Sequence, residues 1–203
     1  MNGSNKMTYA KYKYLMRADY QRISVIYGGG KYILLKILLY THLNLIFFFR
    51  TASYLRNKRN IFARIIYNVI KFIYYRKQLI TGIQLPIGTE VGGGLHFIHF
   101  SDIVIAASSI IGENCTILNG VTLGHSFSAR KDGTPTLGDN VVVFTGAKLL
   151  GAIHIGNRAV IAANAVVTKD VPENCIVAGN PARIISYDTS SLFGNRWSKD
   201  YER

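Results

Sequence analysis

The chain has 203 residues, which is enough for one sizeable domain with an appendage. Of its 24 Lys and Arg residues, fifteen lie in residues 1–80 beside a single acid, Asp19, whereas residues 81–203 carry nine against ten acids. Two cysteines and a polar N-terminus argue against a disulfide framework and a signal peptide, so a cytoplasmic location is expected. The basic, apolar-rich residues 1–80 favour peripheral contact with the anionic inner face of the cytoplasmic membrane over nucleic acid.

Residues 1–81 are predicted to form a basic, aromatic-rich helical region. A short helix is expected at Met16–Arg22, before a glycine triplet that breaks it. Residues 31–49 are strongly apolar and almost long enough to cross a bilayer, but Lys36 and Asn44 would be expensive in hydrocarbon. This segment therefore spans the membrane, lies at its interface or packs against the body of the protein, and the last two are favoured.

A basic polar connector is expected at residues 50–60, followed by an amphipathic helix over residues 61–75. Apolar side chains recur there with helical spacing, at Phe62, Ile65, Ile66, Val69, Ile70 and Ile73. Arg64 and Lys71 share another face of the same helix. Two interpretations stay open: the helix binds an anionic membrane surface, or it packs in the protein with its basic face in solvent.

Residues 82–185 are organised by a period of six. Mostly aliphatic residues fill the slots of two phases, Ile87, Gly93, His99, Ile105, Ile111, Ile117, Leu123 and then Leu137, Val143, Leu149, Ile155, Ile161, Val167. A period of six fits neither a helix nor an ordinary strand, and it is the signature of a hexapeptide-repeat β-helix. The fold class is therefore expected to be mainly β, a parallel β-helix preceded by an α-helical region.

Two places depart from the repeat. Strict counting puts His99 in an inward aliphatic slot, so either the first coil is irregular there or His99 is a satisfied wall residue. The step from Leu123 to Leu137 is two residues too long, so residues 124–136 are predicted to leave the coil as an excursion loop. Such a loop usually serves a ligand or a neighbouring subunit. The polar tail, residues 186–203, is expected to be loosely ordered.

At several motifs the repeat resembles the left-handed β-helix acyltransferases: Asn119–Gly124, Gly146–Lys148, Val167–Pro172 and Gly179–Arg183. Residues 85–105 are similar to serine acetyltransferases, and closer to their relatives that acetylate sugar hydroxyls of capsule and lipopolysaccharide. The resemblance implies acetyl-CoA as co-substrate, a His general base, no metal, and a homotrimer with active sites between subunits.

The expected function is O-acetylation of a sugar hydroxyl on a bacterial surface polysaccharide (capsule or O-antigen) or its precursor. Two alternatives are kept. One is serine O-acetylation in cysteine biosynthesis, and the other is a non-catalytic, membrane-associated trimeric scaffold.

The resemblance implies that His99 is the general base. An imidazole near its reference pKa can take the proton of an acceptor hydroxyl as that hydroxyl attacks the thioester. His125, which lies at the start of the excursion, is the runner-up, since galactoside acetyltransferases carry a catalytic His in that loop. Serine acetyltransferases pair their base with an Asp, but Ile83–Pro86 holds no acid. Either Asp102 or Glu90 replaces it, or the orienting acid is absent.

The same resemblance implies further roles. Asn119, Gly124 and Asp102 are expected in the acceptor and thioester region. The residues expected to bind the cofactor are Gly146, Ala147, Ala163, Lys169 and Arg183. A zinc site of the γ-carbonic-anhydrase kind, built from His96, His99 and His125, is disfavoured by their spacing.

Overall fold

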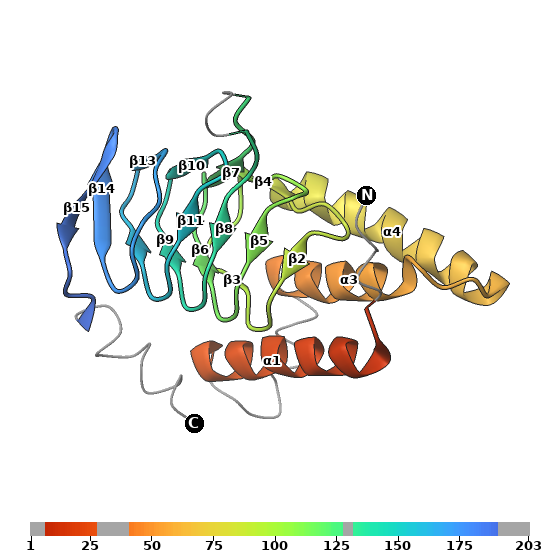
Figure 1. The fold of residues 1–203 in the computed structure, drawn as a ribbon. Helices are drawn as coiled ribbons and strands as arrows, with labels where there is room; N and C mark the ends of the chain where they lie inside the picture. The colour runs from red at the N-terminus through yellow and green to blue at the C-terminus, as the bar shows by residue number, and fades with distance from the viewer. Residues whose placement is uncertain (1–6, 28–40, 128–131, 191–203) are drawn as a thin grey trace.

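The structure is a computed structural model that describes residues 7–27, 41–127 and 132–190. Three helices come first: α1 (Tyr9–Tyr27), α3 (Thr41–Leu55) and α4 (Ile61–Thr81). Helices α3 and α4 lie at one end of a prism of short strands, and α1 runs alongside the prism near that end (Figure 1). Some expectations fall outside the described residues: those for the glycine triplet, for residues 31–40 and for most of the tail.

Short strands, most of two or three residues, make up the rest of the described chain. They are β1 (Ile83–Gln84), β2 (Glu90–Val91), β3 (His96–Phe97), β4 (Ile103–Ile105), β5 (Ile110–Ile111), β6 (Thr116–Ile117), β7 (Thr122–Gly124), β8 (Thr136–Leu137), β9 (Val142–Val143), β10 (Lys148–Leu150), β11 (His154–Ile155), β12 (Val160–Ile161), β13 (Val166–Val167), β14 (Ile176–Gly179) and β15 (Ala182–Ser186).

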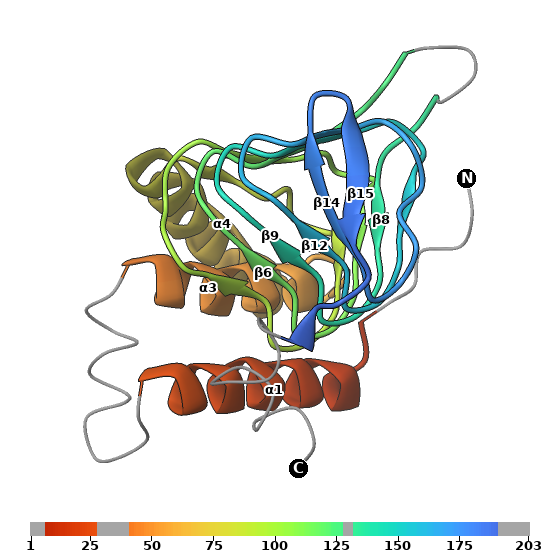
Figure 2. The ribbon, with the colours of Figure 1, turned by 90° about the vertical axis from the view of Figure 1, so that its left-hand side faces the viewer.

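The strands form three sheets that enclose a triangular core, as the view along the axis shows (Figure 2). Sheet A has the order β1-β4-β7-β10-β13, sheet B the order β11-β8-β5-β2, and sheet C the order β15-β14-β12-β9-β6-β3. All pairs between these strands are parallel except β14 with β15. The chain visits A, B and C in turn, so the fold is the expected parallel β-helix preceded by helices.

From Ile105 to Val167 the inward residues are those that the six-residue period predicts. The first coil differs. Its inward positions are Leu85, Val91 and Phe97, because Val91 pairs with Ile111 and Phe97 pairs with Ile117. Partners in this coil are twenty residues apart, which places two extra residues between Phe97 and Ile105. The strict count was therefore wrong for Ile87, Gly93 and His99, and His99 is exposed at an irregular corner.

The helices also differ from the predicted segments. Helix α1 is much longer than the expected Met16–Arg22. Helix α3 continues to Leu55, through part of the segment that was predicted as a polar connector. The start of that segment is buried rather than solvated: Arg50 and Ala52 are 1 and 0% exposed, and Arg50 forms an ion pair with Asp19 of α1.

Helix α4 confirms the predicted amphipathic helix and extends it by six residues. The Asn60 side chain caps its start by accepting a hydrogen bond from Phe62 N at 2.8 Å. Gly82 ends it with a left-handed φ of 66°, which a glycine adopts without strain. Tyr74 anchors the helix, because its buried hydroxyl donates a hydrogen bond to Leu85 O. Within the described residues, no helix is long and apolar enough to cross a membrane.

Candidate active site

One corner of the prism collects most of the candidate residues. This is the C–A corner, where the chain leaves sheet C for sheet A at residues 98–102, 118–121, 144–147 and 162–165. It carries His99 and Asp102 on the first coil and Asn119 on the second. Gly146 and Ala147 lie on the third coil and Ala163 on the fourth. Residues 64 positions apart in sequence therefore lie in one column along the prism.

The two extra residues of the first coil shape the corner around His99. Ser101 and Asp102 both have positive φ, of 102° and 54°, which is uncommon for residues with a side chain. The corner is held by the next coil, since Gly120 N donates to Ser101 O at 3.0 Å. Ser101 Oγ donates to Asp102 Oδ2 at 2.7 Å. His99 and Asp102 are both exposed, so the bulged corner presents an imidazole and a carboxylate to solvent.

The second coil supplies polar groups at the same corner. Asn119 Oδ1 accepts a hydrogen bond from Thr145 Oγ1 at 3.1 Å. The Lys148 ammonium donates to Gly120 O at 2.6 Å and to Thr122 Oγ1 at 3.0 Å. Lys148 belongs to the Gly146–Lys148 motif, but no role was predicted for it from the sequence. The sequence did contain a signal for Lys148 as a site residue, namely its position directly after Ala147, which holds an inward slot.

The small residues of the third and fourth coils differ in what they offer. Gly146 has φ of 76°, and a Cβ there would lie 2.0 Å from Asn164 Oδ1. Ala147 points into the core and is fully buried, so only its backbone borders the corner. Ala163 is exposed. The glycine at 146 is therefore needed by the stacked turns, whatever approaches them.

The remaining candidates lie elsewhere on the prism. Gly124 and His125 lie where the chain leaves sheet A, at the A–B corner, and Lys169 lies at the same corner on a later coil. Arg183 is exposed on β15, paired with Ala178 at the far end. Sheet A thus separates His125 from the column of His99 within one chain.

The excursion leaves the coil at the predicted place and projects from the prism (Figure 2). Its ends are tied by an antiparallel bridge between Ser126 and Gly133. His125 Nε2 lies 3.6 Å from Asp132 Oδ1, and the His125 ring lies 4.6 Å from the ring of Phe127. Phe127 is 90% exposed, so this loop presents an aromatic tip to solvent.

The alternative zinc site is not formed. His96 is buried in sheet C, with its Nε2 3.2 Å from the hydroxyl of Tyr27, whereas His125 lies beyond sheet A. In the described part of the chain, no group of three His, Cys, Asp or Glu side chains could hold a metal ion. Glu90 belongs to sheet B, so of the two acids considered for orienting His99 only Asp102 shares its corner.

Comparisons with known proteins identify the class. Residues 134–169 match the family described as bacterial transferase hexapeptide (six repeats). A serine acetyltransferase of Helicobacter pylori is 38% identical over 153 residues, which are 75% of this chain and 85% of that protein. One from Synechococcus elongatus is 40% identical over 115 residues, 57% of this chain but only 47% of its own length.

The fold agrees with these relatives. The crystal structure of serine acetyltransferase in complex with coenzyme A from Brucella abortus strain S19 superposes with a TM-score of 0.72 at 28% identity. The match covers 89% of this chain and 70% of that one. The protein is thus a hexapeptide-repeat transferase with a left-handed β-helix, and the chain belongs to the serine acetyltransferase family.

The predicted polysaccharide function was wrong. The relatives and the solved structure described above are serine acetyltransferases. The Helicobacter protein, a serine acetyltransferase, is matched over 85% of its length by 153 residues of this chain. The departure from serine acetyltransferases noted above was the missing acid in Ile83–Pro86. Ile83 and Gln84 form β1 in the wall of sheet A, and Asp102 stands at the corner of His99 instead.

Proposed function

We propose that this chain is a serine O-acetyltransferase that moves an acetyl group from acetyl-CoA to the hydroxyl of serine. The observation that carries the proposal is the irregular C–A corner, which exposes the imidazole of His99 in a family of serine acetyltransferases. Asp102, Asn119 and Lys148 surround the same column with polar groups. The chain spans about half of one relative and most of another, so its acceptor is assigned here by family and site chemistry together.

His99 acts as general base in the proposed reaction. Its neutral imidazole takes the proton of the serine hydroxyl while the oxygen attacks the thioester carbonyl. The tetrahedral intermediate then collapses, breaks the carbon–sulfur bond and releases the CoA thiolate. The imidazolium returns its proton to that sulfur, so the products are O-acetylserine and CoA. Asp102 is the group that orients the imidazole, because it is the acid three residues away on the same corner.

A trimer completes the proposed site. In one chain the excursion lies at the A–B corner and His99 lies at the C–A corner, with sheet A between them. A loop that projects from one prism can border the His99 column only of a neighbouring subunit. The active sites then lie between subunits, with His125 and Phe127 of one chain near the column of the next. Lys169 and Arg183 are the exposed cations proposed for the phosphates of CoA.

The deciding experiment supplies the purified protein with acetyl-CoA and L-serine. Release of free CoA is followed with a thiol reagent, and O-acetylserine is identified by mass spectrometry. Parallel reactions use no acceptor, homoserine and a hexose. We expect CoA release that depends on serine and saturates with it.

Two results would contradict the proposal in different ways. If acetyl-CoA binds, as measured by calorimetry, but serine releases no CoA, then the acceptor is wrong and the transferase class stands. If neither acetyl-CoA nor CoA binds to the trimer, then the transferase reading fails and the non-catalytic scaffold is favoured.

A further inference from the structure

Helix α4 turns its apolar face away from the rest of its own chain. Phe62, Ile65, Ile66 and Val69 are 72, 56, 52 and 55% exposed, although helical periodicity places them on one face. Phe72, Leu79 and Ile80, at 68, 77 and 66%, continue that face to the end of the helix. Monomeric soluble proteins rarely expose apolar patches of this extent unless the patch binds something.

The helix packs with its other, narrower side. Tyr74 and Thr81 are its buried residues, and α3 is the element that it contacts most. The far end of α4 runs out beyond the prism (Figure 1). The sequence left open whether the apolar side of this helix packs inside the protein, and within the chain it does not.

Basic side chains border the exposed face. Helical periodicity places Arg76 within the face and Lys77 at one edge of it, whereas Arg64 and Lys71 lie on another face of the helix, on the far side of Tyr75. The helix has no acid, and the single acid of residues 1–80, Asp19, is already paired with Arg50. Lys71 Nζ lies 5.9 and 5.7 Å from the ring centroids of Tyr67 and Tyr75, so its ammonium is carried beside an apolar stem.

This charge selects among occupants. A second copy of α4 would bring the same four cations and no acid, so pairing two such faces would press like charges together. Residues 81–203 carry nine basic residues against ten acids, so this part of the chain has almost no net charge with which to attract a basic helix. An anionic bilayer offers both apolar depth and negative charge.

We propose that α4 is an interfacial helix that lays its exposed apolar face into an anionic lipid surface. The axis of the helix lies parallel to the bilayer, and the flanking Arg and Lys reach the headgroups. The catalytic column on the β-helix remains outside the bilayer. This inference is independent of the acceptor and of His99.

The test measures flotation of the full-length protein with lipid vesicles. One set contains phosphatidylcholine alone, and the other contains phosphatidylcholine mixed with phosphatidylglycerol. We expect binding to the anionic vesicles that weakens with added salt and is much poorer to the neutral ones. Replacing both Ile65 and Val69 by Gln should weaken binding by about tenfold or more. Replacing Arg76 and Lys77 by Gln should cost about fivefold per charge at low salt.

The matched control is Ile185→Gln, since Ile185 is 65% exposed but lies on β15 at the opposite end of the prism. It should float as the unchanged protein does. Thermal unfolding of every variant checks that exposed substitutions leave the fold intact.

Three outcomes would overturn the proposal. The first is no flotation with anionic vesicles. The second is flotation that the Ile65→Gln, Val69→Gln variant leaves unchanged, which would assign the attraction to other cations. The third is a fall in the mass of the assembly for that variant, measured by light scattering without lipid, which would make the face an interface between copies.

Discussion

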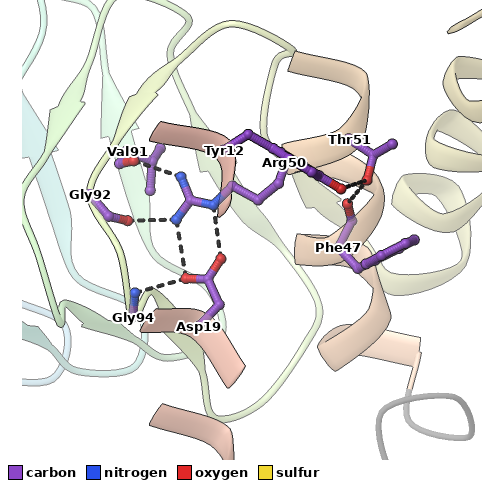
Figure 3. Close-up of polar contacts among 8 residues, drawn as sticks. All are labelled: Tyr12, Asp19, Phe47, Arg50, Thr51, Val91, Gly92 and Gly94. Carbon is purple, nitrogen blue, oxygen red and sulfur yellow. Dashed lines mark hydrogen bonds and ion pairs between the residues drawn. The ribbon is translucent and has the colours of Figure 1, made fainter. Parts of the chain in front are cut away.

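The guanidinium of Arg50 meets the carboxylate of Asp19 at 2.9 Å, with the two side chains 1 and 7% exposed (Figure 3). The same guanidinium donates to Val91 O and Gly92 O, at 2.6 and 2.5 Å. Asp19 Oδ1 also accepts a hydrogen bond from Gly94 N at 2.7 Å. Two helices are thereby fastened to the first coil of the β-helix, which is the coil that carries the irregular corner of His99.

Removing one partner of this pair should destabilise the fold strongly. Arg50→Met leaves a carboxylate and two backbone carbonyls buried without their donor, and we expect a loss of about 3–5 kcal/mol in the free energy of unfolding. Asp19→Asn should cost a comparable amount. Urea unfolding measures both. The control is Arg17→Met. Arg17 is an exposed cation on α1, the helix that carries Asp19, and its replacement should change stability by about 0.5 kcal/mol or less. Equal stability of the Arg17 and Arg50 variants would contradict the buried pair.

Substitution of His99 should remove catalysis and spare binding. Loss of a general base costs roughly 10²–10⁴ in rate, so His99→Ala should lower kcat by that factor and leave the KM for acetyl-CoA nearly unchanged. His154→Ala is the matched control, because His154 is also exposed but lies on sheet B. Steady-state kinetics with serine measures both. A His99→Ala enzyme of full activity, together with an inactive His125→Ala enzyme, would move the base to the excursion.

Much of the β-helix could be predicted because each inward position is marked locally in the sequence, by an aliphatic residue every six positions. From Ile105 to Val167 the six-residue period alone fixes which side chains face the core. The first coil failed because an insertion of two residues at the corner shifts the phase, and counting cannot see where a turn bulges. The shift could have been detected from the sequence. Val91-Gly92 repeats as Ile111-Gly112 on the next coil, and the two are twenty residues apart instead of eighteen.

The helical region shows the limit more clearly. A helical period reveals that α4 has an apolar face, but not whether that face meets the protein, since this depends on how α3 is placed. The pairing of Arg50 with Asp19 likewise joins residues 31 positions apart through tertiary packing. The sequence did hint at an ion pair, because Asp19 is the one acid in a basic segment. It could not show which of the many basic residues is its partner.

The turn at Gly146 should tolerate Asn better than Ala. Its φ of 76° costs a residue with a Cβ about 1–2 kcal/mol, and a Cβ would also displace the side chain of Asn164. Gly146→Ala should therefore lower the free energy of unfolding and raise the KM for acetyl-CoA. Gly146→Asn should be milder, because Asn accepts left-handed backbone, as Asn114 and Asn140 do at other corners. Thermal unfolding and kinetics compare the two, and equal losses would show that the collision with Asn164 dominates.

The thiol of Cys115 should make stability fall in alkaline solution. Burial raises its pKa from 9.0 to about 12, and its Sγ donates to Gly138 O at 3.2 Å. Between these values the unfolded chain has released a proton that the folded protein still holds. Since the unfolded state then binds fewer protons, stability decreases as the pH rises through this window, by at most about 1.4 kcal/mol per pH unit.

Comparison with Cys115→Ala isolates this effect, because other groups that titrate at high pH are common to both proteins. The smaller side chain lowers stability by a constant amount, so the difference between the two proteins should be flat below pH 9 and shrink above it. Urea unfolding over a pH series measures that difference. A difference that stays constant up to pH 12 would show that the thiol ionises in the folded protein as easily as in the unfolded chain.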